Sequence, residues 1–174
     1  MSFFLRVAGI TNAAVWFGST VFFALVVWPA FSSPDMMRIL PPLHRGAAAQ
    51  VIMERYFLVQ YCCGGIAVAH WTIETLYAGK SLQRWVPYWI VGILVLELCS
   101  GLWVEPKLKR GHLEIYAPRS TVQQREQASR TFGFWHTVVQ ISNLVVMLGV
   151  GAYVWEQNRP PAAARFVGAA KFRG

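Results

Sequence analysis

Residues 132–155 read FGFWHTVVQISNLVVMLGVGAYVW and contain no lysine, arginine, aspartate or glutamate. A helix over this stretch would be about 36 Å long, because each residue adds about 1.5 Å. The hydrocarbon core of a bilayer is about 30 Å thick. The stretch is therefore long and apolar enough to cross a membrane as one tilted helix.

Three further stretches share this apolar character, at residues 5–28, 56–78 and 85–104. Together the four stretches predict an all-α integral membrane protein, a four-helix transmembrane bundle that forms one domain over residues 1–158. Residues 159–174 are basic and rich in alanine, glycine and proline, so they are expected to form a tail without a fold of its own.

The composition of the whole chain agrees with a membrane protein. Of its 174 residues, 55% are hydrophobic and 14% are charged, and the mean hydropathy is +0.39. An ordinary soluble domain carries about 25% charged residues. The net charge of +8 is spread between the apolar stretches, so anionic membrane lipids, and not nucleic acid, are the expected partners.

An even number of spans places both ends of the chain on one side of the membrane, here called the terminal side, together with the short connection 79–84. The opposite loop side carries two long loops. The first span is expected to end at Pro29 and the FSSPD stretch at residues 31–35, and the third at the Glu105-Pro106 pair. The loop side has nine lysines and arginines, and the terminal side has seven. Because the cytoplasmic side of a membrane protein carries the excess of these residues, the counts favour a cytoplasmic loop side by a small margin. The expected location is the inner membrane of a bacterium.

The second and fourth helices are expected to extend beyond the bilayer on the loop side. The second has good helix formers from Gly46 onward. The fourth is expected to begin near Thr121, because Ser120 and Gln123 have the spacing of a capping box. Small residues are expected to let the helices approach closely; they include Gly9, Gly18, Gly64, Gly65, Gly149 and Gly151.

Hydrophilic side chains at membrane depth are costly, so each one needs a reason. His136, Gln140 and Asn143 are spaced i, i+4, i+7 and share one face of the fourth helix. Counted along the third helix, Glu97 lies about 10 Å inside the loop-side boundary, at the level of that face. The predicted intramembrane cluster has seven members, which are Ser19, Thr20, Gln60, Glu97, His136, Gln140 and Asn143.

Two interpretations of this cluster stay open. Its members can be contacts between helices that fix their register, at about 0.6–2 kcal/mol each. They can also form an ion, proton or solute site centred on Glu97. A lone carboxyl at this depth is expected to be neutral unless Arg55 or His136 reaches it.

The histidines raise the question of a haem. His70 lies about 21 Å from the loop side and His136 about 6 Å, so the two cannot be axial ligands at one level. A single axial ligand to a haem or pigment, either His70 or His136, stays open. His70 matches Asn12 in depth and is expected to bond to it, whereas His44 and His112 are expected to be solvated in loops.

Sequence motifs of enzymes are absent from the chain. It has no GxSxG, no glycine-rich phosphate loop, no HExxH and no paired carboxylates at catalytic spacing. Cys62, Cys63 and Cys99 lie in apolar stretches without metal-binding or redox spacing and are expected to be packing residues. We therefore expect no catalytic residue, no metal and no enzyme activity, and no cofactor apart from the single-histidine alternative.

Several short motifs carry a family resemblance. They are WFGSTVFF at residues 16–23, VWPAF at 27–31, WVEPK at 103–107, FGFWH at 132–136 and SNL at 142–144. Over roughly residues 7–153 the chain resembles the transmembrane protein 205-like family. The resemblance implies four membrane helices with both termini on one side, and no catalytic activity. The family positions fall on Gly18, Glu105, Pro106, His136 and Asn143.

Three functions are weighed. The first is a structural or accessory subunit that docks into a larger membrane complex, with other membrane-protein subunits as partners that hold the tail in place. The second is a transporter or channel for a small solute or cation, using Glu97 and the polar face of the fourth helix. The third is a module that binds a pigment or haem through a single histidine.

Overall fold

The computed structural model describes residues 2–78 and 86–158. These residues form helices almost throughout, as expected for a chain whose backbone polar groups must be satisfied inside a membrane. In chain order the elements are α1 (Ser2–Phe22), η1 (Phe23–Val27), α2 (Trp28–Phe31), α3 (Pro34–Ile39), α4 (Pro42–Ala78), α5 (Val86–Cys99), η2 (Ser100–Val104), α6 (Glu105–Tyr116) and α7 (Val122–Asn158).

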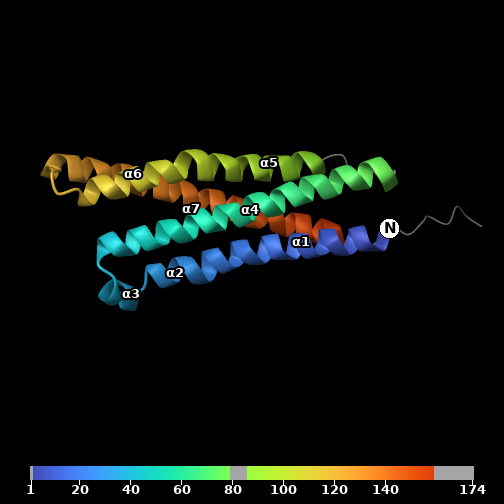
Figure 1. The fold of residues 1–174 in the computed structure, drawn as a ribbon, viewed down its shortest axis with the longest axis horizontal. Coiled ribbons are helices and arrows are strands. Elements are labelled where there is room, and N and C mark those ends of the chain that lie inside the picture. Colours follow the sequence, from blue (N-terminus) through green and yellow to red (C-terminus); the bar gives the residue numbers. More distant parts are fainter. Residues whose placement is uncertain (1, 79–85, 159–174) are drawn as a thin grey trace, which may run out of the picture.

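Four long helical rods lie side by side (Figure 1). The start of α1, the end of α4, the start of α5 and the end of α7 lie at one end of the bundle, which is the terminal side. The rods that are long and apolar enough to span a membrane are Phe3–Phe31, Pro42–Tyr77, Val86–Tyr116 and Val122–Asn158. The predicted all-α four-helix membrane bundle is confirmed.

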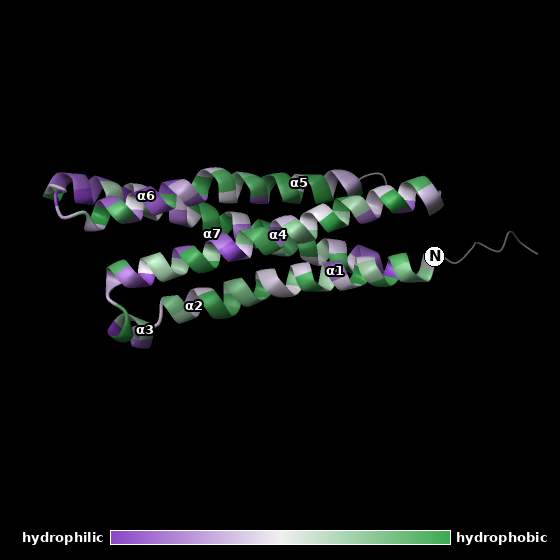
Figure 2. Ribbon diagram, in the orientation of Figure 1, coloured by the Kyte–Doolittle hydropathy of each residue, from purple (hydrophilic) through white to green (hydrophobic). Residues whose placement is uncertain are grey.

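The loop-side end of the bundle is more hydrophilic than the rest. Figure 2 shows the hydrophilic colour concentrated on α3, on α6 and on the part of α7 beside α6. Helices α4 and α7 each contain 37 residues and are about 55 Å long, well beyond the thickness of a hydrocarbon core. Their surplus length therefore lies outside the bilayer, as the sequence predicted.

The first span continues past Pro29 and ends at Phe31, within the stretch that the sequence predicts as its end. The predicted end of the third span at Glu105-Pro106 is wrong, because that helix continues past Pro106 to Tyr116. Each proline is preceded by a π-helical segment, η1 or η2, that begins six residues before it. Proline lacks an N–H and its ring collides with the carbonyl four residues earlier, and the wider π turn accommodates this defect without ending the helix.

The chain consists of two similar units that the sequence analysis did not find. In the first, the rod from α1 to α2 contains η1 and Pro29 and is followed by the 37-residue α4. In the second, the rod from α5 to α6 contains η2 and Pro106 and is followed by the 37-residue α7. The order of elements is the same in both units, apart from the short α3 in the first.

The N-terminus of α7 is closed by a capping box one residue later than predicted. The Thr121 amide donates to Gln124 Oε1 at 2.9 Å, and the Gln124 amide donates to Thr121 Oγ1 at 3.3 Å. Ser120 instead donates through its hydroxyl to the Glu114 carbonyl at 3.0 Å. Both Ser120-Gln123 and Thr121-Gln124 have the required spacing, so only the backbone conformation decides between them.

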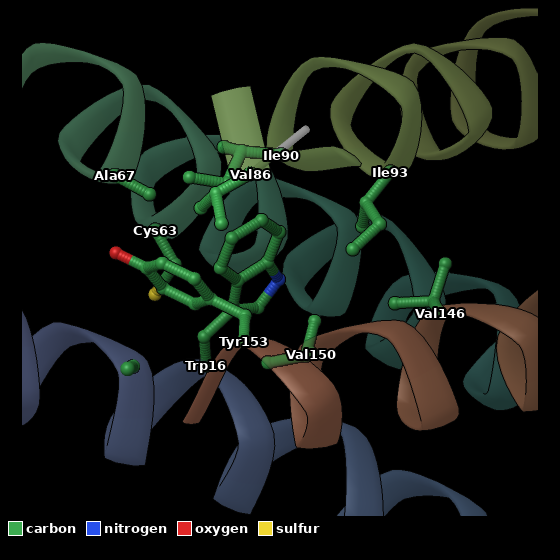
Figure 3. Packing of buried hydrophobic residues seen from close by; sticks show 10 residues of the cluster. Trp16, Cys63, Ala67, Val86, Ile90, Ile93, Val146, Val150 and Tyr153 are labelled. Carbon is green, nitrogen blue, oxygen red and sulfur yellow. The ribbon is translucent and has the colours of Figure 1, made fainter. Parts of the chain in front are cut away.

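The core of the bundle lies where all four rods meet (Figure 3). Trp16 of α1 is fully buried and meets Tyr153 of α7 edge-on, with ring centroids 6.2 Å apart. Cys63 packs in the same cluster as a free thiol, as expected for a small packing residue. The cluster comprises Ala13, Trp16, Cys63, Ala67, Val86, Ile90, Ile93, Val146, Val150 and Tyr153.

Two glycines of α1 differ in what surrounds them. A Cβ atom added at Gly9 would lie 2.6 Å from Cε1 of His70 on α4, whereas one at Gly18 would meet nothing within 4 Å. Gly9 therefore sets how closely α1 and α4 approach, as predicted for small residues between membrane helices. The same prediction is wrong for Gly18, which faces open space.

This difference predicts opposite effects of two alanine substitutions on one helix. We expect Gly9→Ala to lower the free energy of unfolding by about 1–3 kcal/mol, because the added methyl group must displace a buried ring. Gly18→Ala is expected to be neutral or to stabilise by up to about 1 kcal/mol through helix propensity. Thermal unfolding in detergent solution measures both, and equal midpoints for the two variants would contradict this account of the packing.

Candidate functional site

A cavity of about 470 Å³ lies between η1, α2, α4, α6 and α7. Its volume is in the range of pockets that hold small ligands. Among the described residues, Arg45 is the only lysine, arginine, aspartate or glutamate that lines it. Most of the remaining lining is apolar, and its polar members are Ser32, Gln50, His112, Tyr116, His136, Gln140 and Asn143.

The cavity runs from the loop-side extensions of the helices into the membrane-spanning part of the bundle. Arg45 and His112 lie in the loop-side parts of α4 and α6 that the sequence places beyond the bilayer, whereas Phe23 and Asn143 lie within the first and fourth apolar stretches. The charged residue of the lining, Arg45, thus lies at the loop-side end, and apolar side chains together with the amides of Gln140 and Asn143 line the inner part. A solute with a polar head and an apolar body matches this arrangement.

The predicted polar face of the fourth helix forms one wall of this cavity. His136, Gln140 and Asn143 all line it. The His136 ring lies between two aromatic rings, with centroid distances of 4.4 Å to Trp28 and 5.7 Å to Phe132. The helical spacing of i, i+4, i+7 thus placed three hydrogen-bonding side chains along one path into the membrane.

A second, much smaller cavity of about 20 Å³ lies deeper and is lined by Glu97, Ser100, Tyr56 and Asn143. The Tyr56 hydroxyl donates to Asn143 Oδ1 at 2.5 Å. Asn143 lines both cavities, so its side chain belongs to the partition between them. The small cavity is large enough for one water molecule and has the polar partners that a buried water needs.

Glu97 is the least satisfied polar group of the predicted cluster. It is only 2% exposed, and its Oε2 atom has no hydrogen-bond partner. The nearby Trp16 indole likewise lacks a partner of ordinary geometry for its Nε1 atom. Arg55 is exposed to the outside and His136 lines the other cavity, so neither neutralises Glu97, and a charge here would be uncompensated.

The other three members of the predicted cluster join α1 to α4. Gln60 is fully buried, and its Nε2 atom donates to Ser19 Oγ at 3.1 Å. Thr20 Oγ1 lies 3.4 Å from Gln60 Oε1 and 2.9 Å from the carbonyl oxygen of Trp16. These residues therefore act as a hydrogen-bonded contact between helices, and they do not line the large cavity.

The predicted bond between His70 and Asn12 does not form. His70 Nε2 lies 2.7 Å from the Leu5 carbonyl oxygen and must donate, since a carbonyl only accepts. Asn12 Nδ2 donates to the Cys63 carbonyl at 2.9 Å. With Nε2 engaged and the ring against Gly9, Nδ1 is the nitrogen of His70 that has no hydrogen-bond partner among the described residues.

The expectation that His112 is solvated in a loop is wrong. His112 is buried on α6, and its Nε2 atom donates to the Leu43 carbonyl at 3.1 Å. A Cβ atom at Gly46 of α4 would lie 2.0 Å from the His112 ring. The prediction failed because it ended the third helix at Pro106 and so left His112 in the loop that would follow. His44 is exposed, as expected, although it lies in the first turn of α4.

Sequence reasoning also missed Tyr56 and Arg45. Tyr56 was placed at the edge of its span, although it precedes Gln60 by four residues and so shares a helix face with a cluster member.

Of the family positions, Glu105 starts α6 with a buried Oε1 atom that has no hydrogen-bond partner among the described residues. No group of three or more histidine, cysteine, aspartate or glutamate residues that could hold a metal occurs within residues 2–78 and 86–158.

Gln60 forms hydrogen bonds between helices, whereas Gln140 lines the large cavity. We expect Gln60→Leu to lower the free energy of unfolding by about 0.6–2 kcal/mol, because two contacts between α1 and α4 are lost. Gln140→Leu is expected to change it by less than about 0.5 kcal/mol, since Gln140 is exposed towards the cavity. Unfolding in detergent measures both, and a larger loss for Gln140→Leu would contradict this division.

Comparison with known proteins adds a family. The family model described as "Domain of unknown function (DUF4149)" matches residues 12–117, which is more than half of the chain. The match begins in α1 and ends directly after α6, so it contains both π segments and both of their prolines. No curated protein and no solved structure matches the chain.

Proposed function

We infer the function of this chain from its cavity, because the chain belongs to the DUF4149 family, a domain of unknown function. We propose that this integral membrane protein is a non-catalytic carrier that takes a small amphipathic solute from the loop side. The cavity of about 470 Å³ is the observation that supports the proposal.

The lining of the cavity favours a solute with a negatively charged head and an apolar body. Arg45 lines the loop-side part, and no aspartate or glutamate of the described residues lines the cavity. Arginine binds carboxylate, sulfonate and phosphate groups through several N–H donors. The amide groups of Gln140 and Asn143 offer further donors at greater depth.

The two similar units of the chain also support a carrier. Many membrane transporters consist of repeated units, with the binding site formed where the units meet. Here the cavity is lined from both units, by η1, α2 and α4 of the first and by α6 and α7 of the second. A shift of one unit against the other would change access to the cavity.

The alternative of an accessory subunit rests on the tail at residues 159–174, which lies outside the described residues. The exposed apolar side chains of the bundle suit contact with lipid as well as with another subunit, so no observation favours docking. For the single-histidine alternative, His136 lines the large cavity, and the nitrogen that His70 leaves unengaged is its buried Nδ1 atom. We further propose a relationship to the transmembrane protein 205-like family, and location in a bacterial inner membrane with the loop side in the cytoplasm.

Binding and uptake of anilinonaphthalene sulfonate test the cavity. This probe combines a fixed negative charge with an apolar body. We expect wild-type protein in zwitterionic nanodiscs to enhance its fluorescence and Ala49→Trp to abolish the effect, because Ala49 lines the cavity. Ala47→Trp, on the exposed side of the same helix, is the matched control.

Liposomes containing wild-type protein or Ala47→Trp are also expected to take up the probe faster than liposomes containing Ala49→Trp. Equal binding and uptake by the two tryptophan variants would refute the proposal, because only one of them fills the cavity.

A second pair of variants tests the charge of the solute head. We expect Arg45→Gln to weaken binding of the sulfonate about tenfold, since a hydrogen bond to a charged group contributes about 1.5–3 kcal/mol when buried and less when hydrated. Arg55→Gln, on the same helix but exposed to the outside, removes an equal charge and should leave the dissociation constant unchanged. The same weakening in both variants would mean that only net charge matters and that Arg45 does not contact the probe.

A further inference from the structure

Glu97 lines the small cavity, and one of its carboxyl oxygens has no hydrogen-bond partner among the described residues. The side chain is 2% exposed, the partnerless oxygen is Oε2, and the cavity has a volume of about 20 Å³. A buried carboxylate without a cation is costly, and a buried carboxyl that carries a proton is far less so. A buried carboxyl and a water-sized space therefore adjoin in one site.

The groups around Glu97 are neutral or acidic. The titratable groups that face it from α4 are Tyr56, Tyr61 and Cys63. The indole of Trp16 approaches from α1. Ser100 of η2 and Ser142 and Asn143 of α7 share the small cavity with it. The ion pairs among the described residues join Lys109 to Glu54 and Arg130 to Glu126, and neither involves Glu97.

Only a thin partition separates this site from the large cavity. Four residues line both cavities, namely Phe23, Met53, Val139 and Asn143. Asn143 is the polar member of the partition, and the Tyr56 hydroxyl donates to its Oδ1 atom. Tyr56 itself lines the small cavity beside Glu97, so a chain of polar groups leads from the carboxyl to the wall of the large cavity.

We propose that Glu97 is a proton-binding site inside the membrane, which exchanges its proton with the large cavity through one water molecule in the small cavity. When the proton binds, an O–H bond forms on the Glu97 carboxyl and a hydronium ion in the cavity becomes water. When it leaves, that water takes the proton back. The proposal extends the carrier function, because it would let a proton accompany the solute, but the site itself does not require a solute.

Infrared difference spectroscopy of wild-type protein in nanodiscs tests the site directly. At neutral pH we expect the carbonyl stretch of a neutral carboxylic acid. The band should be lost in Glu97→Gln and kept in Glu114→Gln, where the substituted carboxyl is exposed on α6. Glu97→Asp keeps a carboxyl and should move the band without removing it, which covers the case in which Glu97→Gln fails to fold.

Transfer from H₂O to D₂O tests the exchange route. We expect the carbonyl band to shift as the proton is replaced. The shift should be slower in Ala49→Trp, which fills the large cavity, and unchanged in Ala47→Trp. No neutral carboxyl band, or a band that never shifts, would overturn the proposal; so would equal rates in the two tryptophan variants.

A carboxylate band that responds to sodium or potassium would assign the site to a cation and would likewise overturn it. These measurements contain no sulfonate, so they can succeed or fail independently of the solute-binding experiments.

Discussion

The absence of water from the hydrocarbon core of a membrane is the constraint on which this structure depends. Every backbone N–H and C=O group in that layer must be bonded within its own helix. The first and third spans therefore stay helical up to Pro29 and Pro106, and the π-helical segments η1 and η2 just before these prolines let the helices continue into α2 and α6 on the loop side. In water the same prolines would more readily end a helix, because solvent could satisfy the freed carbonyl groups.

This continuation of the helices builds the cavity. Phe31 and Ser32 follow Pro29, and His112 and Tyr116 follow Pro106, and all four side chains line the space of about 470 Å³. If the spans had ended at their prolines, the loop-side half would have no such walls. The two π segments are thus structural features that convert a simple bundle into one with a large cavity.

The polar side chains inside the bundle fall into two groups, according to whether they form hydrogen bonds to other parts of the protein. Gln60 finds its partners across the helix contact with Ser19 and Thr20, and Asn12 and His70 find backbone carbonyls. These bonds hold the helices together, and Nδ1 of His70 is left without a partner among the described residues. Glu97 differs, because its Oε2 atom has no hydrogen-bond partner among those residues and the residue lines a cavity of the size of a water molecule.

The sequence by itself determined the number of spans, the surplus length of α4 and α7 and the polar face with His136, because hydropathy and helical periodicity are local properties of a segment. Depth along a helix could also be counted from the residue number. The tertiary structure alone decided that His112 is buried, that Tyr56 meets Asn143 and that Glu97 forms no ion pair within residues 2–78 and 86–158. These facts depend on how each helix is rotated about its axis and on which neighbour it meets, and the summed packing of all four rods sets both.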